Sequence, residues 1–140
     1  MDVLPGLRAL AFRLSRWPVL LAWMALIFAL SSIPNEFAPA PKPIPLDKLA
    51  HFCEYAALGF LLAGVAWRHT GQRRIGALLI AGAIVLGTLY GASDEFHQRF
   101  VPGRDPALDD LAADAIGSTA GALAAARALS RAADPAPPNT

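Results

Sequence analysis

The sequence has little charge and almost no cysteine. Charged residues make up 16% of its 140 residues, against about 25% in an average soluble domain, whereas hydrophobic residues make up 55%. The single Cys53 excludes an internal disulfide and a cysteine zinc cluster. The formal net charge is only +1, so the chain lacks the general basic field that binds nucleic acid. These features predict one small integral membrane domain.

Two stretches carry no charged residue over a length that can cross a membrane. Residues 17–35 and 75–93 are each 19 residues long, and a helix of about 20 residues spans about 30 Å. We predict a membrane-spanning helix in each.

Two further stretches predict spans that carry polar groups. Residues 49–67 are apolar except for His51 and Glu54 near their start. Residues 111–126 are mostly Ala and Gly and contain Asp114, and small residues suit a helix packed inside a bundle. The expected fold is therefore all-α, an integral membrane bundle of four transmembrane helices.

The N-terminal 16 residues place leucines on one helical face and arginines away from its centre, which predicts a short interfacial helix. A signal peptide is the alternative, because Ala38 and Ala40 have the spacing of a cleavage site. The apolar run is long for a signal peptide and Pro41 follows the site directly, so we favour the retained helix. The expected organisation is a cytoplasmic amphipathic segment 1–16, a transmembrane domain 17–128 and a disordered cytoplasmic tail 129–140.

The connections between the expected spans are short and contain residues that end helices. Every second residue from 38 to 45 is proline, and this pattern predicts an extended segment. Residues 68–74 predict a tight polar hairpin, and residues 101–106, with their Pro-Gly pair, predict a turn into the last helix.

Basic residues are distributed unevenly between the two ends of the expected helices. Eight of the twelve lie at the end that holds both termini, and four lie at the other end. An excess of Arg and Lys marks the cytoplasmic side. We therefore expect both termini to be cytoplasmic.

Nine of the eleven acidic residues lie on the expected outer side. Inserting a charged side chain costs roughly 2.5 to 3.5 kcal/mol at the centre of a translocon-inserted helix and less near the interface. Repeated acids at helix ends therefore indicate a functional role. Spacings of three, four and seven residues place polar groups on one face of each helix. These faces hold Asp47, His51, Glu54 and Tyr55; then Tyr90, Asp94 and Gln98; and then Asp110, Asp114, Gly117 and Gly121. We predict a polar pocket that opens outward between them.

Ordered motifs follow one another along these helices. They are Asp47-Lys48-x-x-His51-Phe52-x-Glu54-Tyr55-x-x-Leu58-Gly59, then Ser93-Asp94-Glu95-x-x-Gln98-x-Phe100-x-Pro102-Gly103-Arg104, and then Asp110. With Ser31-Ser32-x-Pro34 before them, they resemble the VanZ-like membrane protein family over residues 31–121. Where the family often has Asn four residues after the last of these acids, this chain has Asp114.

The resemblance implies a multi-pass protein of the bacterial cytoplasmic (inner) membrane and, through the family's namesake, a link to susceptibility to the glycopeptide teicoplanin. It assigns no reaction. Three functions stay open: an envelope protein whose pocket binds a lipid-linked or cell-wall-related ligand or a partner protein, a metal-dependent intramembrane enzyme acting on a phosphate-containing lipid, and a proton-coupled carrier. The sequence has no nucleophile elbow, phosphate loop or metalloprotease helix, and a carrier of this length would require an oligomer.

The candidate site residues follow from the polar faces and the motifs. The candidates for ligand binding are Asp47, Lys48, His51, Tyr55, Asp94, Gln98, Arg104, Asp110 and Asp114. The candidates for acid–base catalysis are His51, Glu54 and Asp94, and those for a divalent cation are Asp94, Asp110 and Asp114, because carboxylates suit hard cations. Membrane lipids are the other expected partners.

Several candidates also have a purely structural interpretation. Asp47 and Lys48 can form an interfacial pair at a helix start, and His51 can simply bridge polar neighbours. Asp94 and Glu95 point about 100° apart on a helix, so we expect Asp94 to face the pocket and Glu95 to pair with an arginine, Arg99 or Arg104.

Arg104 offers a planar fork of donors to phosphate or carboxylate. Its alternative role is a salt bridge to Asp94 or Asp110 that clamps the loop. The Gly-x-x-x-Gly pairs at 87 and 91 and at 117 and 121 are expected to allow close helix packing.

Overall fold

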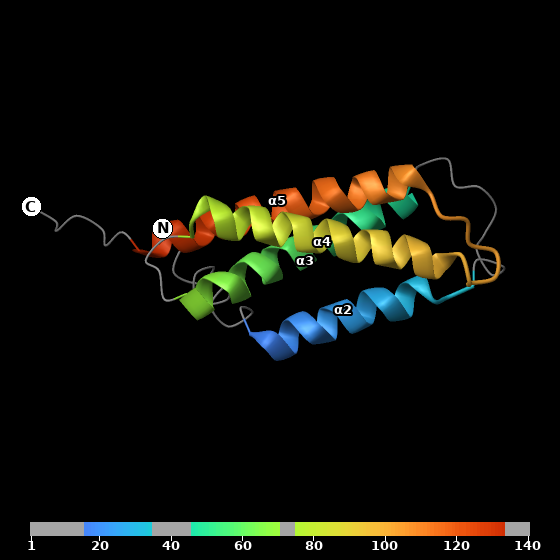
Figure 1. Ribbon diagram of the computed structural model, residues 1–140, viewed down its shortest axis with the longest axis horizontal. Helices are drawn as coiled ribbons and strands as arrows, with labels where there is room; N and C mark the ends of the chain where they lie inside the picture. Colours follow the sequence, from blue (N-terminus) through green and yellow to red (C-terminus); the bar gives the residue numbers. More distant parts are fainter. Residues whose placement is uncertain (1–15, 35–45, 71–74, 134–140) are drawn as a thin grey trace, which may run out of the picture.

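The computed structural model describes residues 16–34, 46–70 and 75–133. These ranges form four helices and no strand: α2 (Trp17–Ser31), α3 (Leu46–Thr70), α4 (Ala77–Gln98) and α5 (Leu108–Ala133). The helices run lengthwise beside one another, alternating in direction (Figure 1). The all-α prediction is confirmed, whereas the interfacial helix expected in residues 1–16 and the extended segment at 38–45 lie outside the described residues, apart from Arg16.

The expectation of four membrane spans is supported for two helices. Among the described residues, α3 and α4 are long and apolar enough to cross a membrane. The helix in the first apolar stretch ends at Ser31 and has only 15 residues. The last helix has 26 residues, but its alanines, glycines and acids give it less apolar character than α3 or α4.

Helix α3 lies at the centre of the bundle and packs most closely on α5. Close approach is possible because glycines meet backbone across this interface: a Cβ on Gly117 would overlap the carbonyl of Phe52, and one on Gly121 would overlap that of Ala56. The predicted packing role of this glycine pair is confirmed. Small residues at these positions let the two helix backbones touch.

Two apolar clusters form the core. One lies between α2 and α3 and is built from Leu20, Ile27, Tyr55, Leu58, Leu61 and Val65. The other joins α3, α4 and α5 through Ala63, Ile75, Ala83, Ala122, Ala125 and Leu129. Two polar contacts also fasten α2, since Trp23 Nε1 donates to the Glu54 carbonyl at 2.9 Å and the Tyr90 hydroxyl donates to the Met24 carbonyl at 2.7 Å.

One end of the bundle gathers the C-terminal ends of α2 and α4 and the N-terminal ends of α3 and α5 (Figure 1). The predicted turn between α4 and α5 is present at this end. Gly103 adopts a φ of 72°, the left-handed region that favours glycine, and the Arg104 N–H donates to the Val101 carbonyl at 3.1 Å. This turn carries Arg104 to the ends of the other helices.

Candidate functional site

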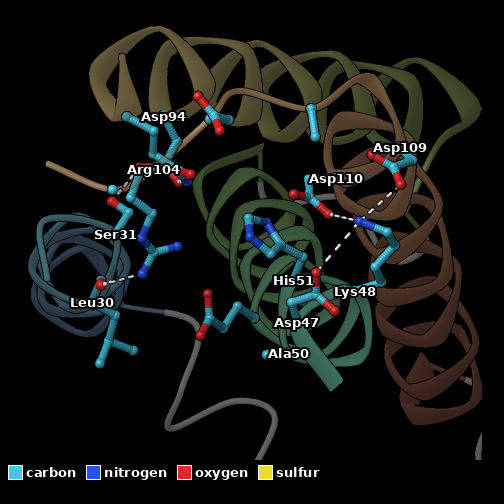
Figure 2. A pocket seen from close by; sticks show the side chains of 15 residues that line it. Leu30, Ser31, Asp47, Lys48, Ala50, His51, Asp94, Arg104, Asp109 and Asp110 are labelled. Atoms are coloured by element: carbon cyan, nitrogen blue, oxygen red, sulfur yellow. Dashed lines mark hydrogen bonds and ion pairs between the residues drawn. The ribbon is translucent and has the colours of Figure 1, made fainter. Parts of the chain in front are cut away.

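A polar cavity of about 510 Å³ lies at this end of the bundle (Figure 2). All four helices and the α4–α5 turn contribute to its wall. The charged and polar residues that line it are Ser31, Asp47, Lys48, His51, Glu54, Asp94, Gln98, Arg104, Asp105, Asp109 and Asp110. The structure therefore brings the three polar helix faces together, at one end of an otherwise apolar bundle.

Most of the residues selected from sequence line the cavity, including all three candidates for acid–base catalysis. Tyr55 and Asp114 do not line it, because both are fully buried behind its wall. Tyr55 packs in the core with its ring stacked parallel to that of His51.

Lys48 joins α3 to the start of α5. Its Nζ lies 2.5 Å from Asp110 Oδ1, 2.9 Å from Asp109 Oδ2 and 3.5 Å from Asp47 Oδ2 (Figure 2). The expected interfacial pair with Asp47 is present, but the two acids of α5 lie closer. The hydrogen bond from Lys48 holds the pKa of the exposed Asp109 carboxyl below its usual value. This lysine is thus committed to carboxylates of its own chain.

Asp94 joins α4 to α2. The Ser31 hydroxyl donates to its Oδ1 at 2.5 Å, and the Gln98 amide donates to its Oδ2 at 3.1 Å. All three side chains are buried. Asp94 faces the cavity as expected, but each of its carboxylate oxygens already accepts a hydrogen bond.

Arg104 fastens the α4–α5 turn to the end of α2. Its Nε donates to the Ile33 carbonyl at 3.2 Å and its Nη2 to the Leu30 carbonyl at 3.3 Å. The alternative salt bridge to Asp94 or Asp110 is not formed, since neither pair is within ion-pair distance in the described structure. Backbone carbonyls at the helix end take the place of a carboxylate. The second terminal nitrogen, Nη1, donates no hydrogen bond to the described residues, and Arg104 lines the cavity.

His51 and Asp114 form a buried pair between α3 and α5. His51 Nδ1 lies 2.9 Å from Asp114 Oδ1, and Asp114 is fully buried. His51 also contributes to the cavity wall. Helix α5 thus supplies the acid that pairs with His51. Residue spacing alone placed His51 and Asp114 only at the same end of the bundle.

Glu95 corrects the sequence-based expectation. It makes no ion pair with an arginine within the described ranges; its Oε2 accepts the Ala107 N–H at 2.8 Å and its side chain is buried. Arg99 instead lies over the Phe96 ring, 5.5 Å from its centroid. The physical reason is that α4 has neighbours on two sides. Asp94 reaches α2 while Glu95 faces the start of α5, so two adjacent acids are both buried.

No curated protein and no solved structure matches the chain. A sequence model of the family described as VanZ/LLP1 matches residues 12–129, which include all four helices apart from the last residues of α5 and every residue of the cavity wall. The chain therefore belongs to the VanZ/LLP1 family.

Proposed function

We propose that this protein is a membrane protein of the bacterial envelope whose polar cavity binds the head group of a lipid-linked or cell-wall-related ligand. The observation that carries the proposal is the cavity itself, about 510 Å³ of space walled by charged side chains at one end of an apolar helix bundle. A polar chamber at the end of membrane-length helices suits an amphiphile, whose apolar part stays in the bilayer.

The outer surface of the bundle supports membrane insertion. Large apolar side chains are exposed along α4, among them Leu78, Val85, Leu86 and Leu89, with Leu78 84% exposed. An apolar surface of this extent is costly in water and suited to lipid. In the sequence, eight of the twelve basic residues belong to the side expected to hold both termini, so we infer that the cavity faces the outer side of the cytoplasmic membrane, with both termini inside.

The charges of the cavity wall support an anionic head group held through Arg104. Lys48 is neutralised by the acids around it, whereas the hydrogen bonds that Arg104 makes to the described residues go to carbonyl oxygens and leave its Nη1 for a ligand. A guanidinium forms strong, directed hydrogen bonds with phosphate or carboxylate. A cell-wall ligand of this kind would also connect the protein to teicoplanin susceptibility.

Native mass spectrometry of gently extracted protein tests the proposal. We expect the unaltered protein to retain a phosphate-containing lipid that differs from the bulk phospholipids, and Arg104→Ala to lose at least about tenfold of the bound fraction because one charge-assisted contact is removed. Arg127→Ala is the matched control, since Arg127 is exposed near the other end of α5.

Two results would contradict the proposal. One is an unaltered protein that carries only bulk phospholipid. The other is equal retention by Arg104→Ala and Arg127→Ala, which would show that the cavity does not hold the lipid.

A further inference from the structure

Three buried side chains from three helices converge behind the cavity. His51 comes from α3, Glu95 from α4 and Asp114 from α5, and one nitrogen or oxygen of each lies within 4.8 Å of the corresponding atoms of the other two. Exposed acids often gather without purpose, but these residues are 8%, 7% and 0% exposed. Their convergence is therefore set by the packing of the bundle.

Two carboxylate oxygens in this cluster have no hydrogen-bond partner. They are Glu95 Oε1 and Asp114 Oδ2, both buried. The opposite oxygens are engaged, by the Ala107 N–H and by His51. A buried oxygen without a partner costs free energy, and more if it carries charge. With both carboxylates ionised, a protonated His51 would compensate only one of them, and a bound cation would balance the other.

We propose that His51, Glu95 and Asp114 bind one divalent transition-metal cation of the zinc or manganese class. An imidazole with two carboxylates is a ligand set that such ions accept, and three protein ligands with an open position are typical of reactive zinc sites. The ion supplies that balancing positive charge and partners for both unpaired oxygens. Ligands bound at about 2.1 Å lie roughly 3.0 to 4.2 Å apart around one ion, so small side-chain rotations complete the site.

This ligand set differs from the one expected from sequence. Asp94 already accepts hydrogen bonds on both oxygens, and Asp110 is paired with Lys48. Of the acids expected to hold a cation, Asp114 is the member of the buried cluster. The packing of α4 against α5 adds Glu95 in place of the other two.

Gly91 makes room for the cluster. A Cβ at this position would lie 2.7 Å from Asp114 Oδ2, which is one of the two unpaired oxygens. Only glycine leaves that oxygen space to turn toward an ion. Because His51 also lines the cavity, an ion held by this cluster would lie next to the cavity wall.

Titration of the purified full-length protein with metal alone tests this proposal. The protein is stripped with a chelator and titrated by calorimetry with Zn²⁺ and Mn²⁺ in detergent, without added lipid. We expect one ion per chain for at least one of the metals, with a rise in melting temperature that grows with ion concentration. Glu95→Gln and Asp114→Asn should weaken binding at least about 100-fold, because they remove direct ligands.

The controls use the same chemical changes at other acids of this end. Asp105→Asn and Asp109→Asn alter exposed cavity-lining acids outside the cluster and should bind the ion as the unaltered protein does. If Asp114→Asn fails to fold, Glu95→Gln decides, because the amide oxygen of Gln can still accept the Ala107 N–H.

The proposal is overturned by an unaltered protein that takes up neither ion, or by cluster variants that bind like the controls, which would place the ion among the exposed acids. Since no lipid enters the titration, a negative result here leaves the proposed ligand of the cavity untouched. Conversely, a variant that loses the lipid but still binds the metal would show that the metal site does not depend on the proposed lipid ligand.

Discussion

At the scale of single residues, the buried acids are held by short contacts to specific partners. Asp94 has both oxygens satisfied, Asp114 has one satisfied by His51, and Glu95 has one satisfied by a backbone N–H. The same residue type thus plays two roles in one small region. Asp94 links α4 to α2, whereas Glu95 and Asp114 each have one carboxylate oxygen without a hydrogen-bond partner.

The hydrogen bond from Ser31 to Asp94 is expected to stabilise the fold. Ser31→Ala removes a donor to a buried carboxylate, and a hydrogen bond to a charged group contributes about 1.5 to 3 kcal/mol. We expect the free energy of unfolding in detergent to fall by that amount. Ser93→Ala is the control, because Ser93 is exposed and bonds only to the Tyr90 carbonyl within its own helix. Equal stability of the two variants would mean that Asp94 finds another donor.

At the scale of helices, the sequence predicted which residues share a polar face but not which helices pack against each face. The three- and four-residue spacings placed Asp47, His51, Asp94 and Asp110 on polar helix faces, and all four line one cavity. Periodicity could not show that α4 is enclosed on two sides, and so it assigned Glu95 to an arginine. A pair of adjacent acids at the end of an apolar helix was the available signal, since burying both requires two packed faces.

Arg104 shows a second limit of prediction from sequence. Carboxylates can be recognised from residue identity, but the carbonyls of Leu30 and Ile33 become acceptors only because α2 ends beside the turn. Every helix end leaves such carbonyls without helical partners. Which side chain reaches them depends on the three-dimensional arrangement of the helix ends.

Close contact between α3 and α5 makes Gly121 sensitive to substitution. Gly121→Ala puts a Cβ against the Ala56 carbonyl, so the helices must separate along their tightest interface. We expect a loss of about 1 to 3 kcal/mol or more in the free energy of unfolding, measured by denaturant titration in detergent micelles.

Gly82→Ala provides the matched comparison for this interface. A Cβ at Gly82 meets nothing within 4 Å, so the gain in helix propensity should raise stability by roughly 0.5 to 1 kcal/mol. Similar effects of the two substitutions would show that α3 and α5 are not in direct backbone contact.

At the scale of the whole molecule, polarity is divided along the bundle. The cavity end gathers acids and Arg104, while apolar side chains are exposed along the sides of the helices. The two helices that can cross a membrane are joined on either side to α2 and α5. The number of spans could not be settled by counting uncharged stretches, because α2 has 15 residues and α5 relies on small side chains for packing.

Cysteine labelling tests which end faces outward. In a Cys53→Ala background, Pro102→Cys places an exposed thiol in the α4–α5 turn, and Thr70→Cys places one at the opposite end. A membrane-impermeant maleimide should label Pro102→Cys in intact cells, and Thr70→Cys only after permeabilisation. The reverse pattern would turn the cavity toward the cytoplasm and remove the basis for an external ligand.

Asp94 and Glu95 are consecutive residues of a rigid helix, yet one is bonded to α2 and the other to the turn that leads into α5. A rotation of α4 about its axis cannot displace one carboxylate and leave the other in place. We therefore expect that a ligand which turned α4 by binding in the cavity would also move the Glu95 carboxylate of the buried cluster.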